Sequence, residues 1–133
     1  MSRRIARETV MQVFYQMEIQ KSFDSQIAQK FVDGVIVDEK DRQYVDDIVK
    51  FFLQNKSIID GNISHNLKDW DIDRISKVDL SILRVAATEI LFKEDIPEKV
   101  SINEAVELAK RYGSDDSPAF INGVLDALSK TKG

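Results

Sequence analysis

Apolar side chains recur along this chain at the three- and four-residue spacing of helices that bury one face. In the first segment, five positions share one stripe: Ala6, Val10, Val13, Phe14 and Met17. The same spacing returns in three longer segments, Val45–Phe52, Ile59–Leu67 and Val78–Ile90. A shorter repeat, with Ile27 and Phe31 and then Val35 beyond Gly34, predicts a brief second helix. No stretch alternates convincingly between apolar and polar residues, so the pattern predicts helices throughout.

Helix-breaking residues are few, with two prolines and five glycines in the chain. That composition favours helices over strands joined by tight turns. Asp38 or Asp41 is the expected N-cap of the helix that carries Val45–Phe52. The segment Ile59–Leu67 is either a separate helix or a kinked extension past Gly61. The sequence therefore predicts an all-α bundle of about six to seven helices.

The last part of the chain, residues 101–130, reads as two helices joined by a short acidic loop. Ser101 and Glu104 have the spacing of a capping box, which would begin the first helix. Gly113 is expected to end that helix in the left-handed conformation. Ser117 followed by Pro118 fits an N-cap and first turn for the second helix. Gly123, inside that helix, predicts close approach of a neighbouring backbone.

Composition narrows the class of protein. With 133 residues, 43% of them apolar and 32% charged, residues 1–133 are predicted to form one globular domain. Cysteine is absent and His65 is the only histidine, so we expect no disulfide, metal site or cofactor. No phosphate-binding loop or paired acid–base constellation occurs, and catalysis is not expected. Without a membrane-length apolar run or a signal-peptide core, the protein is expected in the cytoplasm.

The net charge of −4 means that any contact with nucleic acid requires a local basic patch. Arg3, Arg4 and Arg7 precede the first acidic residue and can share one flank of a helix. Such a cluster suits RNA phosphates or unpaired bases. An exposed, solubilising helix start explains the same residues equally well.

Met11 and Tyr15 also carry two interpretations. They fall opposite the buried stripe, which indicates either a protein-binding surface or a second packed face. Asp116 precedes a helix, where an acidic side chain complements the helix dipole. Phe120 fits a core residue.

Six segments together resemble one known family, in order along the chain: Arg3–Glu8, Gln12–Glu18, Leu67–Ile75, Val78–Glu89, Ile102–Lys110 and Phe120–Asp126. The sequences of the last two segments, INEAVELAK and FINGVLD, are the most specific. They resemble the NusB family of bacterial transcription antitermination factors. Residues 20 to 66 carry no motif of this kind.

The resemblance implies a NusB-like RNA-binding domain that pairs with the ribosomal protein NusE. It would bind the boxA element of ribosomal RNA leader transcripts as single-stranded RNA and join the RNA polymerase antitermination complex. The implied RNA-binding residues, several also suggested above, are Arg3, Arg4, Arg7, Gln12, Lys110, Asp116, Phe120 and Asn122. The implied partner-binding residues are Met11, Tyr15, Asp79 and Arg84.

Two alternatives remain at this level. One is the RNA-binding accessory domain of a ribosomal RNA methyltransferase, which shares the helical fold but would here lack any methyl-donor-binding sequence. The other is a helical scaffold dimer without an RNA role, in which the arginine cluster is incidental. The sequence leaves open whether the free protein is a monomer or a homodimer.

Overall fold

The computed structural model describes residues 3–33, 38–68 and 71–132, and within them the fold is all-α, as predicted. The helices are α1 (Arg3–Gln20), α2 (Ser25–Val32), α3 (Glu39–Gln54), α4 (Lys56–His65), α5 (Lys77–Phe92), α6 (Glu98–Tyr112) and α7 (Ser117–Thr131). A single 3-10 turn, η1 (Ile72–Arg74), precedes α5. The predicted position Val35 lies outside the described residues.

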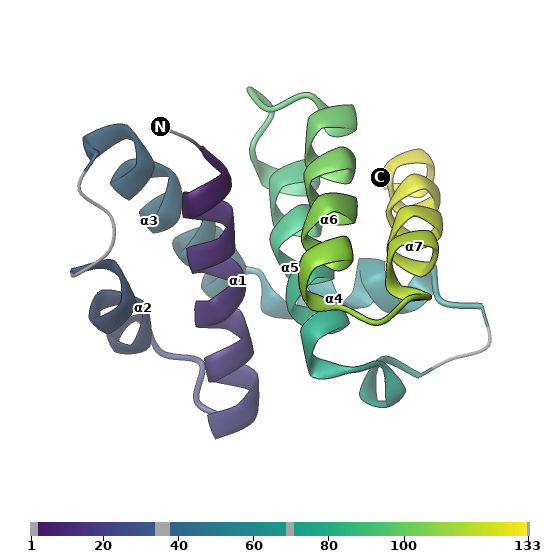
Figure 1. The fold of residues 1–133 in the computed structure, drawn as a ribbon, viewed down its shortest axis with the longest axis horizontal. Coiled ribbons are helices and arrows are strands. Elements are labelled where there is room, and N and C mark those ends of the chain that lie inside the picture. The colour runs from purple at the N-terminus through teal and green to yellow at the C-terminus, as the bar shows by residue number, and fades with distance from the viewer. Residues whose placement is uncertain (1–2, 34–37, 69–70, 133) are drawn as a thin grey trace.

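Helix α5 is the centre of the bundle. It contacts α1, α3, α4, α6 and α7, and its residues 79–90 are all buried. Figure 1 shows α1, α2 and α3 gathered on one side of it and α6 and α7 on the other. Ser76 begins α5 by accepting a hydrogen bond from the Asp79 backbone N–H at 3.0 Å. Because α5 is enclosed, each polar side chain it carries needs a hydrogen-bond partner. Ser81 and Thr88 donate to backbone carbonyls of α5 itself, whereas Arg84 and Glu89 find partners on other helices.

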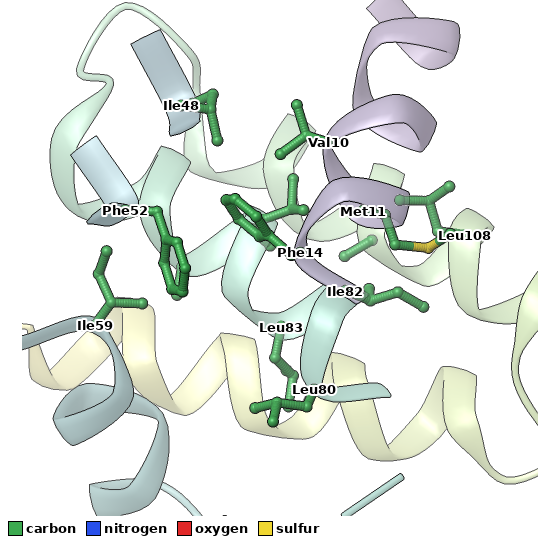
Figure 2. Packing of buried hydrophobic residues seen from close by; sticks show 14 of the residues in the cluster. Val10, Met11, Phe14, Ile48, Phe52, Ile59, Leu80, Ile82, Leu83 and Leu108 are labelled. Carbon is green, nitrogen blue, oxygen red and sulfur yellow. The ribbon is translucent and has the colours of Figure 1, made fainter. Parts of the chain in front are cut away.

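The predicted stripe of α1 forms the middle of the core. All five of its residues are fully buried. The ring of Phe14 packs against Phe52 of α3 with their centroids 4.2 Å apart, and Figure 2 shows both rings between Val10 and Ile59. Burying an aromatic ring of this size stabilises the bundle by about 1.5–3 kcal/mol.

Side-chain hydrogen bonds with nearby backbone groups mark both ends of α3. Asp38 is the N-cap, accepting from the backbone N–H of Lys40 at 2.8 Å. At the other end, the Asn55 side chain donates to the Phe51 carbonyl at 2.9 Å and separates α3 from α4. The segment around Ile59–Leu67 is thus a separate helix, and Gly61 lies inside it.

Four expectations about the last two helices are wrong. Helix α6 begins at Glu98, directly after Pro97, so Ser101 lies inside it and forms no capping box. Gly113 has φ −93° and ψ −170°, which is extended rather than left-handed backbone. A Cβ at that position would lie 2.5 Å from Ser117 Oγ, so close packing explains the glycine.

The N-cap of α7 is Asp116, whose side chain makes no capping hydrogen bond, and Ser117 is the first helical residue. Ser117 Oγ instead accepts from the Ser114 backbone N–H at 3.0 Å, which closes the loop between α6 and α7. The close backbone approach expected at Gly123 is also absent, since a Cβ there would meet nothing within 4 Å.

Candidate nucleic-acid interface

The three N-terminal arginines do not share one exposed flank. The side chains of Arg3 and Arg4 are 39% and 63% exposed, but that of Arg7 is only 6% exposed. Arg7 reaches inward and donates to both carboxylate oxygens of Glu89 on α5, from Nε at 2.8 Å and from Nη2 at 3.0 Å. The expectation that Arg7 faces RNA is therefore corrected, because its guanidinium is already used inside the bundle.

Glu89 joins four helices through hydrogen bonds. Besides Arg7 of α1, it accepts from the Tyr44 hydroxyl of α3 and, at 2.7 Å, from Ser101 Oγ of α6. Burial, followed by the charge of Glu89, raises the pKa of Tyr44 well above its usual value. Burial alone would lower the pKa of Arg7, but its hydrogen bonds to Glu89 and the nearby negative charge together outweigh burial and leave that pKa raised. The start of α1 is thus held by the buried ion pair between Arg7 and Glu89.

The exposed arginines are also paired with carboxylates. Arg4 Nε lies 3.1 Å from Glu104 Oε1 on α6, and this hydrogen bond raises the pKa of Arg4. Arg3 lies over the Tyr44 ring, 4.6 Å from its centroid, with Nε 3.9 Å from Asp41 Oδ1. The expected basic patch is therefore balanced locally by acidic side chains.

A second buried network lies at the other end of α1. Arg84 is 3% exposed and donates to Glu18 Oε1 at 2.7 Å and to both oxygens of Asp60 at 2.9 Å. Burial would raise the pKa of Glu18, but hydrogen bonds from Lys21, Arg84 and Lys77 lower it to about 2. Arg84 was expected at the partner surface, and that expectation is corrected because its guanidinium is enclosed.

One surface hollow, of about 310 Å³, lies beside α1 and contains three of the predicted residues. Tyr15 and Gln12 are exposed at this hollow, whereas Met11 is 5% exposed. Figure 2 shows Met11 next to Leu108 of α6, so its side chain belongs to a second packed face of α1. The lining residues are Met11, Gln12, Tyr15, Gln16, Phe31, Val78, Ser81 and Tyr112.

A second hollow, of about 270 Å³, lies where α5 and α7 begin. It brings Asp79, expected to contact a partner, together with Asp116 and Phe120, expected to contact RNA. Asp79 is 9% exposed, and its Oδ1 has no hydrogen-bond partner among the described residues. Phe120 is half-buried and packs against the core while lining this hollow.

The two remaining predicted residues lie at the surface of the last hairpin. Asn122 is exposed on α7. Lys110 is exposed on α6 and pairs with Glu107, with 3.2 Å between Nζ and Oε2. Sequence reasoning missed Glu89 and Glu104, which decide where the arginines lie. A carboxylate inside the apolar run of α5 was the one signal that pointed to Glu89.

Within the described ranges, no helix is both long and apolar enough to cross a bilayer. The same residues include no cluster of three or more side chains suited to hold a metal ion. Helices packed around a buried centre, with paired charge clusters and hollows at the surface, define a small all-α helical bundle.

Comparison with known proteins gives the family. The sequence profile of the NusB family matches residues 4–130. Transcription antitermination protein NusB of Clostridium novyi (strain NT) is 46% identical over 132 residues, covering 98% of this chain and 99% of that protein. The Bacillus cereus (strain ATCC 10987 / NRS 248) protein of the same name is 45% identical with the same coverage. This chain belongs to the NusB family.

Solved structures agree with this fold. NusB of T. maritima superimposes with a TM-score of 0.92 and 38% identity, covering 98% of this chain and 92% of that one. A crystal structure of the antitermination factors NusB and NusE in complex with dsRNA contains a chain with a TM-score of 0.87 and 26% identity. That match covers 96% of both chains.

Proposed function

We propose that this protein is a transcription antitermination factor that binds boxA-type RNA of ribosomal RNA leader transcripts together with NusE. It acts on termination as part of the RNA polymerase antitermination complex. The observation that carries this proposal is the whole-length match to proteins of that name, joined by a fold shared with a NusB chain bound to NusE and RNA. Residues 1–133 act as a single RNA-binding domain.

The RNA surface is assigned to the exposed cations beside α1 and α6. Arg3 and Arg4 begin α1, and Lys110 lies near the end of α6. These side chains keep their charge at the surface, where they suit backbone phosphates. Base contacts are assigned to Gln12, Asn122 and the exposed part of Phe120, which offer amide groups and a ring for stacking.

The partner surface is assigned to the two hollows. Tyr15 supplies an exposed aromatic ring at the first, which is typical of protein interfaces. At the second, the Asp79 carboxylate has one buried oxygen without a donor. A buried acceptor left unsatisfied costs about 1–3 kcal/mol, so a donor from NusE would stabilise the complex at this point. Asp116 and Phe120 line the same hollow, and RNA and partner therefore meet here.

The protein acts by recognition in the cytoplasm, without catalysis or a cofactor. Its described polar clusters are ion pairs that hold helices together, not groups presented to a substrate. The two antitermination proteins named above are matched over 99% of their length by this chain. This match favours antitermination over the role of a methyltransferase accessory domain.

The test is a titration of fluorescently labelled RNA, followed by anisotropy, with this protein alone, with NusE alone and with both. We expect the mixture to bind single-stranded boxA-type RNA more tightly than either protein, and more tightly than a scrambled RNA of the same length. A boxA strand annealed to its complement separates single-stranded from double-stranded recognition. Equal affinity for boxA-type and scrambled RNA in the presence of NusE would overturn the proposed function.

A further inference from the structure

The most exposed arginine of the assigned RNA surface is already occupied by a carboxylate. Arg4 donates from Nε to Glu104 Oε1 at 3.1 Å and from Nη2 to Glu104 Oε2 at 3.4 Å. This two-point contact uses the same guanidinium edge that would hold two phosphate oxygens. Glu104 and a phosphate cannot occupy that edge together.

Glu104 is not needed to neutralise the other arginine nearby. Arg7 Nη1 lies 4.0 Å from Glu104 Oε1, at the limit of an ion pair. Arg7 already has the shorter contacts with Glu89, at 2.8 and 3.0 Å. The Glu104 side chain is 19% exposed and faces Arg4, which is 63% exposed. Its negative charge therefore acts mainly on Arg4 and on any anion that approaches Arg4.

Two neighbouring cations of α6 are likewise paired with carboxylates. Arg111 pairs with Glu8 and Lys110 pairs with Glu107, so cations and carboxylates alternate between α1 and α6. A shallow cleft lined by Arg4, Arg7, Glu8, Glu104, Glu107, Leu108 and Arg111 collects these charges. An RNA phosphate reaching Arg4 must displace one carboxylate and lie beside others.

We propose that Glu104 sets the RNA affinity of this surface by competing with the RNA backbone for Arg4. The inference rests on the proposed function, because it assumes that RNA binds at α1. An exposed ion pair of this kind is weak, so a phosphate can exchange with it. The displaced carboxylate then repels the phosphate at short range, which lowers affinity for RNA in general.

The test uses Glu104→Gln, which removes the charge and keeps the size of the side chain. We expect this variant to bind boxA-type RNA about threefold to tenfold more tightly at roughly 50 mM salt, with a smaller gain at about 300 mM. Asp46→Asn is the matched control, because Asp46 is an exposed carboxylate in a separate hollow between α2 and α3. It changes the net charge equally, and we expect less than about a twofold change in RNA affinity.

A double-mutant cycle with Arg4→Ala shows whether Glu104 acts through Arg4. In the Arg4→Ala background, we expect the gain from Glu104→Gln to fall below about twofold. Circular dichroism confirms that each variant is folded, and Glu104→Ala, with the same expected direction, is the second variant should Glu104→Gln fail that check.

Three outcomes overturn the inference: weaker binding by Glu104→Gln, a gain no larger than that of Asp46→Asn, or a gain that persists without Arg4. Each of these leaves the proposed function standing if Arg4→Ala alone weakens RNA binding. RNA affinity unchanged by Arg4→Ala would instead remove the RNA assignment of α1 and the inference with it.

Discussion

Replacing Arg7 by alanine should destabilise the fold far more than replacing Arg4, although the two residues are neighbours in one cluster. Arg7 and Glu89 are 5% and 1% exposed, and removing the arginine leaves a carboxylate charge inside the bundle. Breaking a buried pair in this way costs about 3–5 kcal/mol. Tyr44 and Ser101 would still donate to Glu89, so we expect a loss near 3 kcal/mol.

Arg4→Ala removes an exposed ion pair and should lower the free energy of unfolding far less than Arg7→Ala does. The assay is urea unfolding followed by circular dichroism at 222 nm, with thermal unfolding beside it. A loss near 3 kcal/mol in a chain of this size lowers the melting temperature by roughly 10 °C or more. Glu89→Gln combined with Arg7→Ala should cost less than the sum of the single changes, by at least about 1 kcal/mol.

An Arg7→Ala loss as small as that of Arg4→Ala would refute this reasoning. It would mean that the Arg7 guanidinium is solvated, and it would return Arg7 to the RNA surface. The comparison also decides how RNA affinities of the variants are interpreted. A double variant of Arg4 and Arg7 would combine a loss of RNA contacts with a loss of folding stability.

Three further predictions follow from the same contacts. The pKa of Glu18 is lowered from 4.5 to about 2, so its hydrogen bonds contribute stability that is fully present above pH 4.5 and lost as the pH falls towards 2. Acid unfolding should show this as a loss of about 3 kcal/mol, and Glu18→Gln should flatten the curve in that window. Asp79→Asn should weaken NusE binding about tenfold or more in calorimetric titration while changing the melting temperature little; unchanged binding would remove Asp79 from the partner surface. Gly113→Ala should lower stability by about 1–3 kcal/mol in urea unfolding because its Cβ would meet Ser117, and a neutral result would show that the loop relaxes freely.

Much of the fold was predictable because the signal is local. The stripe on α1 and the apolar run of α5 each repeat at helical spacing, and each is buried as the repeat requires. Asp38 accepts hydrogen bonds from backbone N–H groups two and three residues away, so its capping role can be predicted from the neighbouring sequence.

The arginines were placed wrongly because their partners are distant in sequence. Arg7 meets Glu89 82 residues later, and Arg84 meets Glu18 66 residues earlier. Spacing within one helix cannot reveal either contact, and an arginine on a helix flank has no local mark of burial. Ser101 shows the same effect, since a hydrogen bond to Glu89 takes precedence over the capping box that its neighbours suggest.

The grouping of the candidate site residues could not be predicted from the sequence. The sequence assigned Asp79 to a partner surface and Asp116 and Phe120 to an RNA surface, yet one hollow holds all three. Gln12 and Tyr15, also assigned to different surfaces, share the other hollow. Asp79 lies on α5, whereas Asp116 and Phe120 lie at the start of α7, so only the packing of these two helices shows that the three residues share a hollow.

The most direct test of the central claim is the salt dependence of RNA binding by the wild type and by Arg4→Ala. If Arg4 contacts a phosphate of single-stranded RNA, the plot of log affinity against log salt concentration should become shallower by roughly 0.7 in the variant. Its affinity for boxA-type RNA should also fall, with the melting temperature nearly unchanged. Identical slopes and affinities for two folded proteins would contradict the account, because RNA would then not be held by the start of α1.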